Sequence, residues 1–203
     1  MSSDKMEKLT ETFSKLTTPP DFSLKEYFKN LELIIKKILS RPENDVLTYD
    51  VLDTEKSKKN KLLSLKEKQR QMKIGEIWQE VIGNYKDLIN LGIGHETGLD
   101  ILSNIRKLAI ELKNRTNTDN ASSKKSNLDK LSKFKKENPE YTCIYANIND
   151  NTEKKTLQGS NKKIMHNGVE IEHQVGYQFL TFIFGEKTKE IIEFVKNTID
   201  KYI

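Results

Sequence analysis

The chain has 203 residues, of which 32% are charged and 35% are hydrophobic, so it can form one sizeable domain with a core and an appended helical segment. Its formal net charge of +5 fits a polyanionic partner such as nucleic acid, although many basic proteins bind none. The single cysteine, Cys143, excludes an internal disulfide and suggests a reducing compartment.

The N-terminal third predicts helices. Its first residues, MSSDKMEKLTETFSKL, lack the continuous apolar stretch of a signal peptide. The segment LELIIKKIL is interrupted by two lysines and cannot span a membrane, so we expect a cytoplasmic protein without membrane contact. Residues 22–39 show the apolar spacing of an amphipathic helix, whereas residues 53–73 are rich in lysine and glutamine and predict a loop and a polar helix. We therefore expect a helical extension over 1–72 and the main domain over 73–203.

The main domain begins with a strong helix pattern. Apolar residues recur with helical spacing over 74–90, and the glycine-bounded turn GIGHETG ends the pattern. Strand candidates follow at 98–103 and 107–114, joined by a short polar connection. These elements predict a helix followed by a β-hairpin.

The remaining elements alternate between helix and strand. A basic helix over 123–138 is ended by Pro139. The later elements are a strand YTCIYANI, a hairpin IMH-NG-VEIEH whose Asn167-Gly168 pair suits a tight turn, and two C-terminal helices, GYQFLTFIF and TKEIIEFVKNTIDKYI. This order predicts an α/β fold.

Three charged residues lie within the apolar strand candidates of the hairpin. Glu111 and Lys113 are two residues apart and share one face of a strand, while Leu112 and Ile110 point to the opposite face. If 98–103 pairs with this strand, Asp100 lies beside Glu111. Isolated buried charges are costly unless they are paired or bind a metal, so the pattern indicates a functional site.

Two carboxylates and an ammonium at one sheet edge suit phosphodiester hydrolysis. Asp100 and Glu111, with the backbone carbonyl of Leu112, provide the all-oxygen ligands that Mg²⁺ prefers. The metal would polarise the phosphate, and Lys113 would orient or deprotonate the attacking water. A bare Glu-x-Lys triplet is weak, since a second one occurs at Glu153, and an exposed ion pair on an edge strand is the simpler alternative.

The pattern of Asp100, Glu111-Leu112-Lys113 and the surrounding elements resembles the PD-(D/E)xK nucleases. The stretch from KIGEIWQEVIG to YTCIYANIND is similar to type II restriction endonucleases of that superfamily, nearest to a subgroup that cuts GGNCC. The motifs are GHETGLD, IELKNRTNTDNASSKKSNLDKL and ENPEYTCIYANIND, and the likeness covers about 73–185. Leu99 stands where the family pattern has proline.

This resemblance implies an α+β nuclease core, with a central mixed sheet flanked by helices, that cleaves double-stranded DNA with Mg²⁺ and leaves 5′-phosphates. It also implies a cognate DNA methyltransferase as a companion. A short palindromic target requires two active sites related by a twofold axis, so a homodimer is expected. The alternatives are a structure-specific repair or recombination nuclease and a non-catalytic DNA-binding protein.

Further residues are second candidates for the metal site. Glu76 and Glu80 share a face of the helix at 74–90, and a helix glutamate often supports the metal in this superfamily; Glu76 is the preferred one. His95 and Glu96 precede the first strand and could contact the metal shell or the phosphate. Simple solvent exposure is the alternative for each of them.

The loop after the catalytic strand predicts DNA contacts. Arg115 can bind guanine in bidentate fashion, and asparagine and aspartate side chains can read adenine and cytosine; the candidates are Asn117, Asp119 and Asn120. Helix-start amides and ammoniums suit backbone phosphates; these candidates are Ser122, Ser123, Lys124 and Lys125. The alternative is a solvated surface loop.

Overall fold

A computed structural model describes residues 22–42, 46–92, 94–115, 121–149 and 162–202. A six-stranded mixed sheet, in the order β1-β2-β3-β4-β6-β5, lies at its centre. The strands are β1 (Ile89–Asn90), β2 (Ile101–Ser103), β3 (Leu108–Arg115), β4 (Thr142–Asn149), β5 (Lys162–His166) and β6 (Val169–Val175). The pairs β3–β4 and β4–β6 are parallel and the others are antiparallel.

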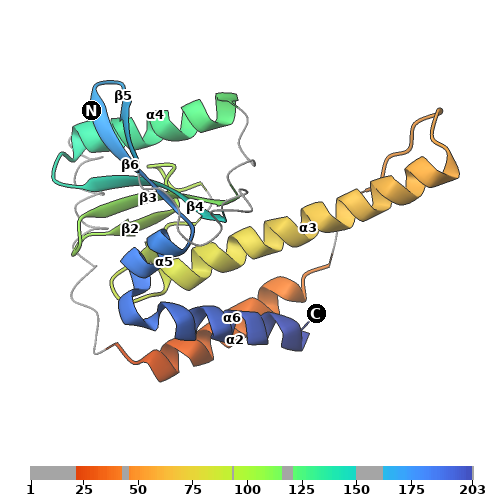
Figure 1. The fold of residues 1–203 in the computed structure, drawn as a ribbon, viewed down its shortest axis with the longest axis horizontal. Coiled ribbons are helices and arrows are strands. Elements are labelled where there is room, and N and C mark those ends of the chain that lie inside the picture. Colours follow the sequence, from red (N-terminus) through yellow and green to blue (C-terminus); the bar gives the residue numbers. More distant parts are fainter. Residues whose placement is uncertain (1–21, 43–45, 93, 116–120, 150–161, 203) are drawn as a thin grey trace.

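Helices cover both faces of the sheet (Figure 1). One face carries α4 (Ala121–Glu137), and the other carries α2 (Leu24–Leu39), α3 (Glu55–Gly83), α5 (Gly176–Phe184) and α6 (Thr188–Tyr202). None of the helices within the described ranges is long and apolar enough to cross a membrane. The expected α/β class, with a mixed sheet flanked by helices, is confirmed.

Side chains of β3 and β4 alternate between two hydrophobic cores, as the pleat of a strand requires. Ile110 and Leu112 lie in the core shared with α2, α3, α5 and α6. Ala109 and Cys143 lie in the second core, under α4. Glu111 and Lys113 therefore belong to the α4 face, at the point where the apolar residues of that face give way to polar ones.

The polar helix predicted within 53–73 is confirmed, but the predicted loop is limited to residues 53 and 54, because α3 runs without interruption from Glu55 to Gly83. Lysine, glutamine and glutamate favour helix even where no apolar periodicity is present, and the Thr54 hydroxyl caps the start by accepting from the Ser57 amide. The helix also crosses residues 72 and 73, and α2 packs in the same core as α3. The division into an extension and a main domain stays a prediction.

The helix predicted over 74–90 ends earlier, at Gly83. Asn84 caps it, the backbone turns at Lys86, which has a φ of 55°, and Ile89 begins β1. A Cβ atom on Gly83 would lie 2.5 Å from the Cβ of Asn90, so only glycine lets β1 pass this close to the end of α3.

The expected hairpins are confirmed, with one difference in length. β2 begins at Ile101 rather than at residue 98, and it pairs antiparallel with β3. The β5–β6 hairpin turns at Asn167 and Gly168, which have φ values of 49° and 80°. Positive φ at both positions explains the Asn-Gly pair.

Candidate active site

The β2–β3 hairpin places Asp100 next to Glu111. Ile101 lies opposite Ile110, and the Asp100 amide donates to the Ile110 carbonyl at 3.2 Å. Asp100 therefore lies one residue before β2, across from Glu111 in the register.

The Asp100 carboxylate is held by two donors. Its Oδ2 accepts a hydrogen bond from the Leu112 amide at 2.7 Å, and its Oδ1 accepts one from Nε2 of Gln79 on α3 at 3.0 Å. Because the N–H and C=O of one strand residue point to the same side, the Leu112 carbonyl also faces the edge where Asp100 lies.

Glu111 is the most buried charged side chain of the site, with 2% of its surface exposed. Its Oε1 accepts from the Lys113 ammonium at 2.7 Å, and the Lys130 ammonium of α4 lies 4.0 Å from the same oxygen. Its Oε2 is buried and has no hydrogen-bond partner among the described residues. A buried carboxylate oxygen without a partner is costly, and a cation would satisfy it.

Burial dominates the electrostatics of both carboxyls. Desolvation raises the pKa of Asp100, and the Leu112 amide and the nearby lysines counteract only part of this. Desolvation also raises the pKa of Glu111, and the negative charge of Asp100 raises it further. Two adjacent carboxyls that resist ionisation favour a bound cation, which stabilises their charged forms.

The donors fit a hard divalent cation. Within the part of the chain that the structure describes, no group of three or more histidine, cysteine, aspartate or glutamate side chains could hold a metal. Asp100 and Glu111, which lie opposite each other in the hairpin, would be the acidic ligands, and the Leu112 carbonyl would add a neutral oxygen. Such an oxygen-only set, completed by water, suits Mg²⁺ better than Zn²⁺.

The second candidates for the metal site, Glu76, His95 and Glu96, either contact other residues or are exposed. Glu76 forms a bidentate pair with Arg41, at 2.8 and 2.6 Å, instead of contacting Asp100. Gln79, three residues later on α3, takes that position. His95 Nδ1 lies 2.9 Å from the Thr97 hydroxyl, and Glu96 is exposed.

The predicted DNA-binding residues lie around the start of α4. The backbone of Arg115 ends β3, paired with Asn149 of β4, while Asn117, Asp119 and Asn120 are outside the described residues. Ser122, Ser123, Lys124 and Lys125 lie in the first turns of α4, and the Lys124 ammonium lies 5.8 Å from the centroid of the Tyr145 ring. The helix thus presents its lysines beside the same face of the sheet as Glu111.

The sequence interpretation missed Gln79 and Lys130. Gln79 could have been found, because it lies one turn from Glu76 on the same helix. No sequence signal indicates Lys130, since its approach to Glu111 depends on how α4 packs. A Cβ atom on Gly98 would lie 3.3 Å from Cδ of Lys130, so the glycine leaves room for the lysine stem.

A polar row continues from the site across the sheet. Asn147 of β4 lies beside Lys113 in the strand register, is buried, and accepts a hydrogen bond from Nε2 of His173 on β6 at 2.8 Å. These polar side chains on the α4 face extend the site toward the β5–β6 hairpin.

Comparison with known proteins identifies one match. The family model described as Eco47II restriction endonuclease matches residues 3–203. No curated protein and no solved structure matches the chain. The match covers the strands of the site and the N-terminal helices alike.

Proposed function

Because the chain belongs to the Eco47II restriction endonuclease family, and is thus a site-specific deoxyribonuclease, we propose that Asp100, Glu111 and Lys113 form its Mg²⁺-dependent centre for cleaving DNA. The buried, unpartnered Oε2 of Glu111 next to Asp100 carries this assignment. A purely structural ion pair would not require a second, half-buried carboxyl beside it.

The assignment gives each side chain a role. A bound Mg²⁺ would supply Lewis-acid polarisation of the scissile phosphate and lower the pKa of water. Asp100 and Glu111 would hold it, with the Leu112 carbonyl as a third oxygen. Gln79 fixes the orientation of Asp100 through its hydrogen bond to Oδ1.

The lysines act on the phosphate side. Lys113 is held by Glu111 at 2.7 Å and is 24% exposed, so its ammonium can reach a substrate while it remains positioned. There the ammonium orients the attacking water and stabilises the charge that develops on the phosphate, whereas deprotonation of the water would require the neutral amine form of Lys113. Lys130, 39% exposed and 4.0 Å from Glu111, adds a second positive charge.

The finer properties follow from the same proposal. We infer cleavage within a GGNCC-type sequence that leaves 5′-phosphates, and a homodimer, because two strands of a palindrome require two centres related by a twofold axis. A cognate DNA methyltransferase would protect the host sequence.

Digestion of mixed-sequence DNA with Mg²⁺, followed by sequencing of the ends, tests the proposed function. We expect a uniform short motif with 5′-phosphate ends, and GGNCC would confirm the subgroup. Nicks that depend on junctions or flaps would instead support a repair nuclease. An absence of cleavage in Mg²⁺ and in Mn²⁺ would overturn the assignment of the centre.

Divalent metal should stabilise the protein in a pH-dependent manner. A raised folded-state pKa means that the folded protein holds protons that the unfolded chain has released. Asp100 and Glu111 therefore make the free energy of unfolding fall as pH rises from about 4 through their raised pKa values. At pH 8, Mg²⁺ at about 100 times its dissociation constant should restore about 2.7 kcal/mol.

Thermal unfolding of wild type and the Asp100→Asn/Glu111→Gln double variant, with and without Mg²⁺, measures this effect. Asp53 has a pKa lowered to about 2, mainly by its hydrogen bond from Lys61, and contributes the opposite pH slope, so the difference between the two proteins is the relevant quantity. Equal stabilisation of both proteins by Mg²⁺ would place the metal elsewhere.

Recognition should separate into two kinds of contact. If Arg115 contacts guanine, Arg115→Ala should cost about 1–3 kcal/mol of discrimination at one base pair. Lys124→Ala and Lys125→Ala should weaken binding to all sequences and reduce the salt dependence by about one phosphate each. Titrations of cognate and single-substituted duplexes at several salt concentrations distinguish the two. If all three variants bind like wild type, recognition lies elsewhere, first of all in 150–175.

A further inference from the structure

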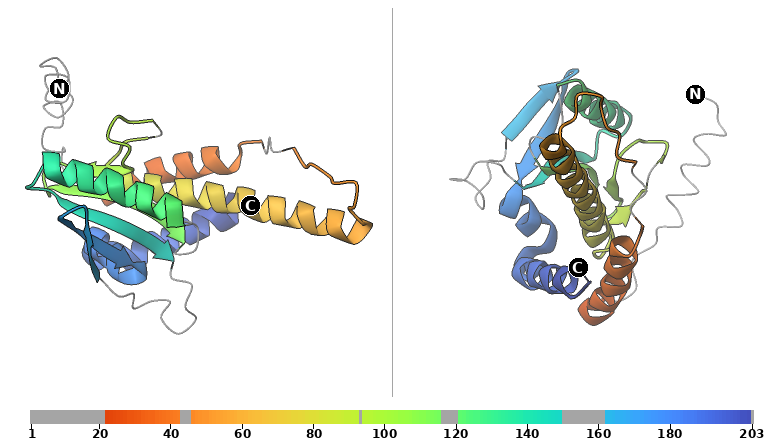
Figure 2. Two further views of the ribbon diagram at one scale, coloured as in Figure 1. Left: turned by 90° about the horizontal axis from the view of Figure 1, so that it is seen from above. Right: turned by 90° about the vertical axis from the view of Figure 1, so that its right-hand side faces the viewer.

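The first half of α3 projects from the rest of the molecule. Figure 1 and Figure 2 show its N-terminal turns extending beyond the ends of α2 and α6, and none of residues 55–68 is buried. We call the segment Glu55–Arg70 the basic arm. At 1.5 Å per residue it is about 24 Å long.

The basic arm has a high density of positive charge. It contains seven lysines and arginines against two glutamates, a net charge of +5, which equals the net charge of the entire chain. All other residues together sum to zero. The arm should therefore attract a polyanion strongly, as α4 should, whose six lysines and two acidic residues give a net charge of +4.

Four of these cations form a stripe along one side of the helix. Lys56, Lys59, Lys66 and Arg70 are separated by 3, 7 and 4 residues, which keeps them on one side of an α-helix. All four side chains are exposed, and Lys56, Lys59 and Lys66 form no ion pair within the described ranges. The stripe spans about 21 Å, which corresponds to about six base steps of 3.4 Å along a DNA strand.

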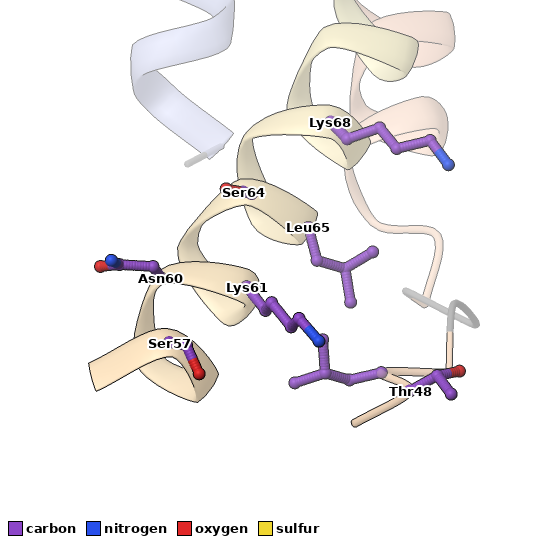
Figure 3. A pocket seen from close by; sticks show the side chains of 8 residues that line it. Thr48, Ser57, Asn60, Lys61, Ser64, Leu65 and Lys68 are labelled. Carbon is purple, nitrogen blue, oxygen red and sulfur yellow. The ribbon is translucent and has the colours of Figure 1, made fainter. Parts of the chain in front are cut away.

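The opposite side of the arm is occupied by the chain itself. Lys61, Leu65 and Lys68 line a groove against the segment that contains Leu47 and Thr48 (Figure 3). The Lys61 ammonium pairs with Asp53 at 2.5 Å. The segment containing Leu47 and Thr48 therefore packs on one side of the arm, and the stripe lies on the opposite, exposed side.

The C-terminal end of the basic arm lies next to the candidate active site. Gln71, one residue after the arm, accepts a hydrogen bond from the Asn114 amide at 3.0 Å, and Asn114 follows Lys113 on β3. Further along the same helix, Gln79 contacts Asp100. A single continuous helix therefore connects the carboxylate centre to the stripe.

We propose that the stripe of the basic arm binds the phosphate backbone of duplex DNA outside the sequence that is cleaved. The inference rests on the proposed function, because it takes the DNA to pass the centre at Asp100 and Glu111. Phosphate contacts carry no base information but add affinity and orient the duplex. Exposed Leu62 and Leu63 would favour a second copy of this chain instead, but two arms of charge +5 repel each other, whereas DNA complements them.

The test neutralises the stripe and keeps the helix. The variant Lys56→Gln/Lys59→Gln/Lys66→Gln/Arg70→Gln uses a residue with good helix propensity. The matched control, Lys25→Gln/Lys29→Gln/Lys37→Gln/Lys189→Gln, removes the same charge from exposed positions on α2 and α6. Binding is measured in Ca²⁺ with cognate duplexes of 12 and 30 base pairs at several salt concentrations.

We expect wild type and the control to bind the long duplex at least 10-fold more tightly than the short one. The stripe variant should lose this gain, and its slope of log affinity against log salt should fall by about 3.6, since each of the four phosphate contacts contributes about 0.9. Equal length and salt dependence for the variant and the control would overturn the proposal. A changed oligomeric state in sedimentation, with unchanged DNA binding, would overturn it in favour of a second copy.

The outcome is separable from that of the proposed function. The stripe variant should still cleave cognate DNA in Mg²⁺ at low salt, because the centre is intact. If wild type shows the length-dependent binding but does not cleave, the assignment of the centre fails while the arm is supported. If wild type cleaves and the length dependence is absent, the arm proposal fails while the centre is supported.

Discussion

Replacing Lys113 with alanine should reduce cleavage in Mg²⁺ by about 10³-fold, the range for losing a donor that stabilises charge in the transition state. The ammonium lies 2.7 Å from Glu111 Oε1 and remains partly exposed, which places it between the buried carboxylate and an incoming phosphate. Specific binding in Ca²⁺ should stay within a few-fold of wild type, because the role proposed for this lysine is on water and phosphate and not on base edges.

Single-turnover cleavage and Ca²⁺ binding titrations on the same duplex measure both effects. Lys196→Ala is the matched control, since its exposed ammonium pairs with Glu193 on α6 and should leave both quantities unchanged. Lys130, at 4.0 Å from Glu111, remains in the Lys113 variant and could support residual activity, so a double variant should be slower still. Full activity of Lys113→Ala would refute its role.

Replacing Asp100 with asparagine, or Glu111 with glutamine, should abolish cleavage, a loss of about 10⁴-fold or more, because each substitution removes one of two acidic ligands. The amides keep the size of the side chains. Metal-free DNA binding should become equal to or tighter than that of wild type, since a negative charge near the phosphates is lost.

Gel shifts in EDTA and cleavage over a range of Mg²⁺ and Mn²⁺ concentrations test this prediction. The matched control is Glu76→Gln, because Glu76 pairs with Arg41 away from the centre and should retain cleavage. Normal cleavage by either carboxylate variant would show that Asp100 and Glu111 do not form the metal site. Loss of cleavage in the Glu76 variant, with an unchanged melting temperature, would instead indicate that Glu76 takes part in the metal site.

Apolar periodicity does not predict the full length of the helix that forms the basic arm. Residues 53–73 have helix-favouring side chains but almost no apolar periodicity, because this part of α3 packs against little of the molecule. Amphipathic spacing reports burial and therefore does not reveal a helix that projects into solvent. The reverse error occurs after Gly83, where Leu88 continues the apolar spacing although the helix has ended and the chain leads into β1 at Ile89.

The sequence by itself determined the hairpin that carries the candidate centre. Alternation of apolar residues over 107–114 gave the strand its buried faces, and this alternation placed Glu111 and Lys113 together, because the period of two is a local property of extended backbone. The position of Asp100 beside Glu111 was also predictable, because a short connection between the two strands makes them pair as a hairpin. The Asn-Gly turn of the β5–β6 hairpin was also local, since it depends on two backbone dihedral pairs.

Only the tertiary structure decided which side chains surround that hairpin. Gln79 rather than Glu76 contacts Asp100, because the rotation of α3 against the sheet is set by side-chain packing over its whole buried length. Lys130 approaches Glu111 because α4 lies across the other face, beside Gly98. These two contacts join residues 21 and 19 positions apart through the packing of rigid elements, and no local spacing in the sequence encodes an angle between two elements.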